Sequence, residues 1–214
     1  MITTIVFDVG ETLTRDDRYW GRWADWLGVP RHTLSALVGA VVAQGRDNAD
    51  AVRLLRPGID LRAERAAMEQ AGVTEHLDDS DLYGDVRSGL TALRKAGYAI
   101  HIAGNQTVRA GELLRALDLP ADSVSTSAEW GIAKPDLGFF ERVLQTTGTD
   151  PSATLYVGDH PANDIVPARA AGLRACLIRR GPWGHLWSDD PNVTPDWKID
   201  GILELRDLLG CRHT

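Results

Sequence analysis

The chain has 214 residues, of which 43% are hydrophobic and 25% charged, and its formal net charge is −7 at pH 7. This composition is typical of a soluble globular protein, and no apolar run is long enough to cross a bilayer. The negative charge is spread without a basic block and would repel a phosphate backbone, which argues against binding to nucleic acid. The length fits one domain, or one domain with a large insertion.

The N-terminal stretch and the cysteines indicate the compartment. Residues 1–7 lack the basic flank and the small-residue cleavage site of a secretory signal. Cys176 and Cys211 form neither a disulfide framework nor a metal-binding spacing. We therefore expect a cytoplasmic protein. The sequence does not determine the oligomeric state, and a homodimer is one possible assembly.

Apolar stretches predict six β-strands, at about residues 4–9, 99–103, 123–126, 154–157, 174–178 and 197–199. Segments of helical period lie between them, near residues 86–96, 108–117, 136–147, 161–171 and 202–209. Regular alternation of this kind indicates βαβ units. We expect an α/β fold with a Rossmann-like parallel sheet.

Residues 15–83 show a different pattern, because they contain no convincing strand and have helical spacing throughout. We predict a helical cap domain over residues 15–83, inserted into an α/β core of residues 1–14 and 84–214. A cap at this point would lie above the strand ends and favour a role in substrate selection. Its tryptophans at every third position, Trp20, Trp23 and Trp26, are more typical of the buried face of a helix than of a pocket.

Short polar motifs follow four of the predicted strands. They are Asp8, Gly104-Asn105, Lys134-Pro135-Asp136, and Gly158-Asp159 through Asp164. The carboxyl ends of parallel strands meet at one edge of an α/β sheet, where ligands bind. The order of the motifs therefore predicts one crevice that contains a nucleophile, a cation and metal ligands.

The residue types in these motifs suit phosphoryl transfer. An Asp at a strand end, such as Asp8, can attack phosphorus and form an aspartyl-phosphate, although a turn Asp before a Gly is the better explanation when this residue is taken alone. Asp159 and Asp164 lie one short loop apart, and oxygen-rich loops suit Mg²⁺. Lys134 is one of only three lysines in the chain, so its position after a predicted strand suggests a role in the site, with a solvated side chain as the alternative. Three converging carboxylates against one ammonium leave a deficit of two positive charges, which a divalent cation would cancel.

In this order the motifs resemble those of the haloacid dehalogenase-like (HAD) superfamily, whose Rossmann-like core carries a cap after the first motif. The resemblance rests on Phe7 through Leu13, Ala133 through Asp136, and Val157 through Asp164. It implies a hydrolase, a phosphatase of a small phosphorylated metabolite that acts through an aspartyl-phosphate. By the same resemblance, Asp8 is the nucleophile, Lys134 steadies it and the transferring group, and Mg²⁺ is held by Asp8, Asp159, Asp164 and the backbone carbonyl of Gly10.

Gly10 departs from the family pattern, because phosphatases of the family usually carry a second Asp two residues after the nucleophile, as general acid and base. Losing a general acid costs about 10²–10⁴ in rate. Glu11 and His160 are candidate replacements. The sequence favours a Glu11 side chain that points into solvent and a His160 without catalytic duty.

Gly104 is the second departure, at a position where the family commonly has a Ser or Thr that binds phosphate. The backbone N–H groups of Gly104 and Asn105 could still bind an oxyanion near a helix start. Asn105 could equally be a helix N-cap. Arg179 and Arg180 are expected at a solvated edge rather than in a phosphate site.

Two alternative functions stay open. One is carbon–halogen cleavage, because dehalogenases of the superfamily also lack an Asp at the position of Gly10; they work without metal, however, so the Asp159–Asp164 loop argues against it. The other is a catalytically impaired, ligand-binding member of the family. Retention of Asp8 and Lys134 argues against that reading, because a binding module needs no nucleophile.

Overall fold

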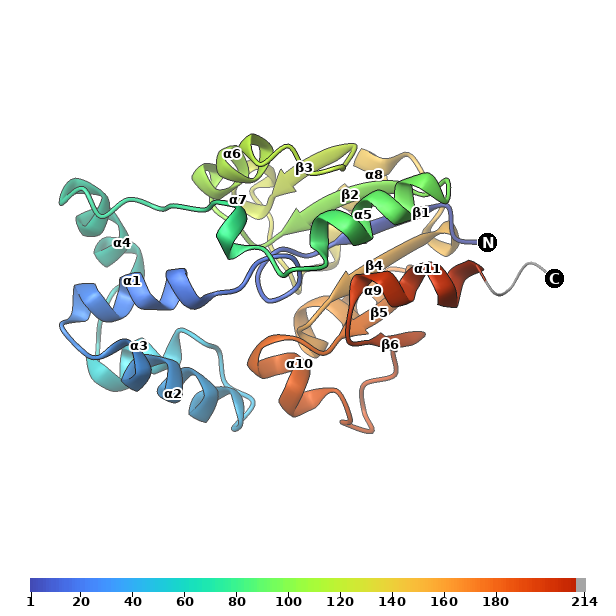
Figure 1. Cartoon of the computed structure of the whole chain (residues 1–214). Coiled ribbons are helices and arrows are strands. Elements are labelled where there is room, and N and C mark those ends of the chain that lie inside the picture. The colour runs from blue at the N-terminus through green and yellow to red at the C-terminus, as the bar shows by residue number, and fades with distance from the viewer. Residues whose placement is uncertain (211–214) are drawn as a thin grey trace. The chain divides into compact units, whose positions relative to one another are not determined.

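The computed structural model describes residues 1–210, which form two compact units (Figure 1). One unit combines Met1–Arg15 with the chain from Leu77 onward, and the other is Asp16–His76. Residues 77–83 group with the first unit, where Leu82 is buried and Leu77 and Tyr83 pack against the hydrophobic core.

The first unit contains a six-stranded, all-parallel sheet with the strand order β3-β2-β1-β4-β5-β6. The strands are β1 (Thr4–Phe7), β2 (Ala99–Gly104), β3 (Ser123–Thr126), β4 (Thr154–Gly158), β5 (Arg174–Ile178) and β6 (Trp197–Ile199). All six lie where the sequence predicts them, to within two residues at their ends. The α/β, Rossmann-like fold class is therefore confirmed. The central strand β1 is completely buried, as a strand covered on both faces must be.

Helices cover both faces of this sheet. They are α5 (Val86–Lys95), α6 (Val108–Ala116), α7 (Ser127–Trp130), α8 (Leu137–Thr147), α9 (Val166–Ala170), α10 (Gly181–Trp187) and α11 (Ile202–Gly210), with short 3₁₀ turns η1 (Asp79–Asp81) and η2 (Pro151–Ala153) and a π-helical turn η3 (Pro161–Ile165). Figure 1 shows α5 and α11 together on one face. Ile5 and Phe7 of β1 pack on that side, whereas Val6 packs on the other, against Phe139 and Tyr156. This alternation along β1 follows from the two-residue period of a strand.

The second unit is entirely helical within its described secondary structure. Its helices are α1 (Asp17–Leu27), α2 (Arg31–Val42), α3 (Asp50–Leu55) and α4 (Leu61–Gln70), in agreement with the helical spacing of the sequence in this region. Trp23 is buried, and the indole of Trp26 donates a hydrogen bond to Glu64 on α4 (2.7 Å). The prediction that the tryptophans form a buried face holds for Trp23 alone, because Trp20 and Trp26 are only partly buried.

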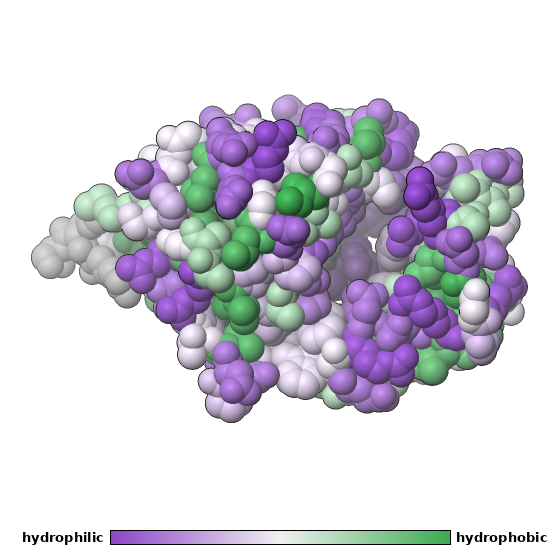
Figure 2. Space-filling view, turned by 180° about the vertical axis from the view of Figure 1, so that it is seen from behind, coloured by the Kyte–Doolittle hydropathy of each residue, from purple (hydrophilic) through white to green (hydrophobic). Residues whose placement is uncertain are grey.

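The exposed large hydrophobic residues of the described chain are distributed over many elements. Among residues 1–210, the exposed large hydrophobic residues are Met1 and seven residues on six different helices: Leu54, Val108, Leu137, Val166, Leu186, Leu203 and Leu208. On the face drawn in Figure 2, hydrophobic residues are interleaved with hydrophilic ones. Among residues 1–210, no helix has the length and apolar character that a membrane span requires.

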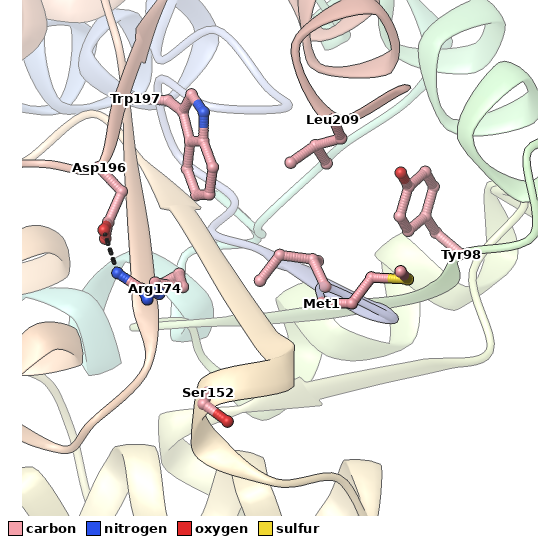
Figure 3. A pocket seen from close by; sticks show the side chains of 8 residues that line it. Met1, Tyr98, Ser152, Arg174, Asp196, Trp197 and Leu209 are labelled. Atoms are coloured by element: carbon pink, nitrogen blue, oxygen red, sulfur yellow. Dashed lines mark hydrogen bonds and ion pairs between the residues drawn. The ribbon is translucent and has the colours of Figure 1, made fainter. Parts of the chain in front are cut away.

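A cavity of about 320 Å³ opens at the amino ends of the strands (Figure 3). Its walls come from the residues that precede or begin β1, β2, β4, β5 and β6, together with Leu209 of α11. Arg174 on its wall is paired with Asp196 at 2.8 Å. The cavity therefore lies at the edge of the sheet opposite to the one that carries the polar motifs.

Candidate active site

Asp8 lies at the carboxyl end of the central strand. Its backbone N–H donates to the carbonyl of Val157 on β4 (2.9 Å), so the sheet hydrogen bonding continues one residue past β1. The residue is only 7% exposed. A carboxylate at the end of a buried parallel strand is held rigidly, at the edge of the sheet where α/β folds bind their ligands.

Lys134 joins Asp8 to Asp164. Its ammonium nitrogen lies 2.6 Å from Oδ1 of Asp8 and 2.6 Å from Oδ1 of Asp164, and its side chain is 3% exposed. The rings of Tyr156 and Phe139 flank the ammonium, with centroids at 5.4 and 5.9 Å. Burial alone would lower the pKa of Lys134, but the carboxylates of Asp164 and Asp8 outweigh it and hold this pKa well above its usual value. The structure therefore has a fixed positive charge beside Asp8.

The environment of Asp8 opposes its ionisation. The pKa of Asp8 is raised from its ordinary value of 3.8 to about 6, mainly by burial; the Lys134 ammonium and a backbone hydrogen bond from Val9 lower this pKa, whereas the Asp164 carboxylate adds to the rise. One ammonium does not compensate for the loss of solvation and for the neighbouring carboxylate. The ionised, nucleophilic form of Asp8 would gain from additional positive charge at this point.

Asp159 and Asp164 follow β4 and complete the acidic group. Both are buried, and ligand oxygens of Asp8, Asp159 and Asp164 all lie within 4.8 Å of one another. The second oxygen of Asp164 accepts a hydrogen bond from the backbone N–H of His160 (2.9 Å). Two ligands of an octahedral Mg²⁺, each at about 2.1 Å, lie roughly 3–4 Å apart. The spacing and the donor chemistry of the three carboxylates therefore fit such an ion.

The chain after β4 bends in a way that the sequence pattern does not predict. Instead of one helix over residues 161–171, the structure has a π-helical turn, Pro161–Ile165, followed by α9. Such turns occur frequently at functional sites. A side chain at position 158 would place its Cβ 2.2 Å from Oδ2 of Asp164, so Gly158 is required for Asp164 to reach the strand end.

Asn105 has a role that the sequence did not indicate. Its side-chain amide donates to the carbonyl of Lys134 (2.9 Å), and its side-chain carbonyl accepts the N–H of Lys134 (2.8 Å). The N-cap of α6 is Thr107, whose hydroxyl accepts the N–H of Ala110 (2.9 Å). The N-cap interpretation of Asn105 is therefore wrong, because the helix begins two residues later than that interpretation requires. Oxyanion binding by backbone N–H groups here stays a prediction.

Gly104 lies against the carboxylate of Asp8. A Cβ at this position would be 2.5 Å from Oδ1 of Asp8 and 3.1 Å from a methyl group of Val9. The missing side chain therefore makes room for the Asp8 conformation that contacts Lys134. This close approach gives a physical reason for the departure from Ser or Thr at this position.

Glu11 does not follow the expectation of a solvent-directed side chain. It accepts a hydrogen bond from the hydroxyl of Tyr83 and has a left-handed backbone conformation (φ 51°). The Glu11 side chain therefore lies beside Tyr83 and Gly181. His160 stacks on Trp183, with ring centroids 3.9 Å apart, and its Nδ1 accepts the N–H of Asn163 (3.3 Å).

Arg180 is buried, so the prediction of a solvated edge is wrong for this residue, although the side chain of Arg179 is 44% exposed. The reason is the helix α10, which the sequence pattern did not reveal. Gly181 begins this helix, and the guanidinium of Arg180 turns inward to contact Thr12, Asp85 and Tyr83. No local sequence signal joins positions so far apart.

Comparison with known proteins identifies the family. The model of the haloacid dehalogenase-like hydrolases matches residues 2–172. The chain is 35% identical to a glyceraldehyde 3-phosphate phosphatase of Methanocaldococcus jannaschii over 41% of the chain and 37% of that protein, and 32% identical to a phosphoserine phosphatase of Thermus thermophilus over 58% of the chain and 49% of that protein. The chain belongs to the haloacid dehalogenase-like hydrolases.

Solved structures support the same fold. A HAD hydrolase of Bacillus subtilis, YfnB, described as bound to magnesium, has a TM-score of 0.70 at 18% identity and covers 97% of this chain and 98% of its own. A 2-haloacid dehalogenase of Pseudomonas syringae has a TM-score of 0.58 at 24% identity, with coverage of 99% and 100%. The curated phosphatases above match the chain over half of their own length or less.

Proposed function

We propose that this protein is a Mg²⁺-dependent phosphohydrolase that acts on a small phosphorylated metabolite through an aspartyl-phosphate at Asp8. One observation carries the proposal: a buried Asp8 carboxylate contacts the Lys134 ammonium at 2.6 Å within a cluster that contains two further carboxylates. The phosphatase relatives support this choice of chemistry.

The proposed metal ligands are the carboxylates of Asp8, Asp159 and Asp164, with the backbone carbonyl of Gly10. The three carboxylates and the Lys134 ammonium together carry two excess negative charges, which a divalent ion matches. When bound, Mg²⁺ would supply positive charge to the phosphoryl oxygens as the reaction proceeds. The fit of charge and spacing supports magnesium.

In the first step, an oxygen of Asp8 attacks phosphorus and the bond from phosphorus to the leaving oxygen breaks, which gives the aspartyl-phosphate and an alkoxide or aryloxide. In the second step, water attacks the phosphorus of this intermediate, releases phosphate and restores the carboxylate. Lys134 remains charged throughout and stabilises negative charge on both Asp8 and the transferring group. Asn105 keeps the backbone of Lys134 in place.

Gly10 limits which esters react well. It has no side chain to protonate the leaving oxygen, so the oxygen must depart as an anion or take its proton from water. Aryl phosphates and acyl phosphates have stable leaving groups, whereas sugar phosphates do not. We therefore expect activated phosphates to be the better substrates.

We propose that the helical unit, Asp16–His76, is the cap domain of the family fold and selects the substrate by shape. Its insertion between β1 and β2 in the chain supports this assignment.

Cys176 is a free, buried thiol, and burial raises its pKa. An unreactive thiol of this kind suits a protein of the reducing cytoplasm.

The test is hydrolysis of an aryl phosphate by the wild-type protein and by Asp8→Asn, each with Mg²⁺ and with a chelator. Asp189→Asn is the matched control, because that side chain is 87% exposed. We expect turnover only in the wild type and the control, and only with Mg²⁺. Turnover by Asp8→Asn at the wild-type rate would reject the proposal.

Carbon–halogen cleavage is the second candidate, favoured by the absence of a side chain at Gly10. Its assay is halide release from a 2-haloacid in the presence of chelator. The acidic cluster of Asp8, Asp159 and Asp164 favours the phosphatase instead, because a carboxylate-rich site without a cation carries unbalanced negative charge. Release of chloride from a chlorinated 2-haloacid without metal, together with no release of phosphate from an aryl phosphate, would favour the dehalogenase over the phosphatase.

A further inference from the structure

Arg180 lies in a part of the first unit that the proposed chemistry leaves unexplained. Its side chain is only 7% exposed, although the residue lies in the short connection between β5 and α10. Burying a guanidinium is costly unless its charge and its N–H groups are matched. The partners that match it therefore indicate what the residue does.

The first partner is the loop that follows the nucleophile. Nη1 of Arg180 donates to the carbonyl of Thr12 (2.6 Å). Within this loop, the carbonyl of Val9 accepts the N–H groups of Thr12, Leu13 and Thr14 at 3.2, 2.8 and 3.0 Å. The loop therefore consists of tight turns in which these three N–H groups bond the carbonyl of Val9. Arg180 holds this loop at Thr12, which lies four residues after Asp8.

The second group of partners is the segment that returns to the core after the helical unit. Nη2 of Arg180 contacts Oδ1 of Asp85 at 2.5 Å, and the guanidinium lies over the ring of Tyr83 at 4.2 Å. The other oxygen of Asp85 accepts the N–H of Ile202 at the start of α11 (2.7 Å). A planar guanidinium can make two directed hydrogen bonds and stack on a ring at the same time.

These two segments also contact each other. Thr14 pairs with Leu82 as an antiparallel bridge, the N–H of Tyr83 donates to the carbonyl of Leu13 (3.0 Å), and the Tyr83 hydroxyl donates to Glu11. Gly181, next to Arg180, has φ 57°, and a Cβ there would lie 2.6 Å from the Glu11 side chain. The start of α10 is thus shaped to accept this loop.

We propose that Arg180 is a positioning residue, which holds the loop of Gly10–Thr14 and the segment of Leu82–Asp85 in one arrangement and thereby keeps the backbone next to Asp8 in its reactive geometry. The proposal rests on the proposed function, since it assigns Arg180 to the reaction of Asp8. It does not require Arg180 to contact the substrate.

The first measurement is amide hydrogen exchange on the full-length protein, comparing wild type, Arg180→Lys and the control Arg179→Gln. Lysine keeps a positive charge beside Asp85, so the Asp85 carboxylate is still neutralised in this variant. A lysine ammonium cannot, however, donate to both Thr12 and Asp85 and stack on the ring of Tyr83 at the same time. We expect exchange in peptides covering residues 9–15 and 81–85 to become about tenfold faster, with the rest of the sheet unchanged. Arg179→Gln should exchange like the wild type.

The second measurement is turnover of an aryl phosphate below the melting temperature of each variant. We expect Arg180→Lys to lower kcat about 10- to 100-fold, as for a small misplacement of reacting groups, while KM changes by less than about threefold. Arg180→Gln, which removes the charge, should lower kcat at least as much. Arg179→Gln should retain wild-type kcat.

Wild-type exchange in both segments of Arg180→Lys would overturn the proposal. So would uniformly faster exchange with a lower Tm and unchanged kcat, because that result describes a residue that only stabilises the fold. If the wild-type protein hydrolyses no phosphate, the proposed function fails, and the exchange comparison by itself still decides whether Arg180 holds these two segments.

Discussion

Two hydrogen bonds join the side chain of Asn105 to the backbone of Lys134: the amide donates to the carbonyl at 2.9 Å and the side-chain oxygen accepts the N–H at 2.8 Å. Asn105 follows β2 directly, so the end of the strand fixes a loop residue 29 positions further along the chain. The ammonium of that residue contacts both Asp8 and Asp164. The amide of Asn105 therefore anchors the backbone of the residue that carries the positive charge of the site.

Asn105→Ala should lower kcat by about 10- to 100-fold, because Lys134 loses both backbone anchors while its own side chain is unchanged. The measurement is steady-state hydrolysis of an aryl phosphate. Asn192→Ala, an exposed amide whose side chain bonds Asp190, is the control and should leave kcat unchanged. Equal kcat in Asn105→Ala and the wild type would show that Lys134 needs no such anchor.

Gly104→Ala should reduce activity by displacing the nucleophile. The added methyl group would lie 2.5 Å from Oδ1 of Asp8, closer than any ordinary contact, so the carboxylate must turn away from Lys134. We expect kcat to fall by about tenfold or more. Gly39→Ala is the control, because a Cβ there meets nothing within 4 Å and Ala favours a helix. A crystal structure of Gly104→Ala with Asp8 unmoved would contradict this explanation.

Without metal, Asp8 should make the protein less stable as the pH rises. The folded-state pKa of about 6 lies above the ordinary value of 3.8, mainly through burial, so the folded protein binds this proton more tightly than the unfolded chain. The corresponding stability is present below pH 3.8 and is lost as the pH rises through 6. The Asp8→Asn variant has no carboxyl group at this position, so its stability does not depend on this proton.

Urea unfolding in chelator at a series of pH values measures this effect. Above pH 6.5, Asp8→Asn should be more stable than the wild type by about 1–3 kcal/mol, and the difference should shrink toward pH 4. Asp189→Asn should follow the wild type at every pH, since its side chain is 87% exposed. A constant difference between Asp8→Asn and wild type across the range would mean that the Asp8 proton is not its origin.

Gly10→Asp should improve the hydrolysis of unactivated esters. Gly10 does not have a positive φ, so a side chain is compatible with its backbone. A carboxylic acid at this position could protonate the leaving oxygen, an effect worth about 10²–10⁴ in rate. We expect the rate ratio of aryl phosphate to alkyl phosphate to fall in this variant. An equal ratio in both proteins would show that leaving-group protonation does not limit the wild type.

The sequence predicted the parts of this structure that depend on local pattern. Runs such as Ile5-Val6-Phe7 are apolar because the strand is covered on both faces, and the segments that follow β1, β3 and β4 then bring Asp8, Lys134 and Asp164 together. The sequence could not predict the partner of Asn105, because either a helix cap or a backbone contact suits the same amide. The burial of Arg180 depends on Thr12 and Asp85, which only the tertiary fold places beside it.

The π-helical turn after β4 shows a second limit. The residues of Pro161–Ile165 have a helical pattern, and nothing in that pattern distinguishes a wider turn from an α-helix. The close approach of Asp164 to Gly158 accompanies the wider turn, and this contact depends on the three-dimensional path of both segments. Pattern therefore located the metal-binding candidates, whereas their geometry required the structure.

The central claim is that Asp8 attacks the phosphoryl group. Borohydride reduces an acyl phosphate, so treating the enzyme with it during turnover of an aryl phosphate, followed by peptide mass spectrometry, locates the residue that carries the phosphoryl group. We predict conversion of Asp8 to homoserine only when both substrate and Mg²⁺ are present. Turnover that leaves Asp8 unmodified, or modification of a different carboxylate, would contradict the account.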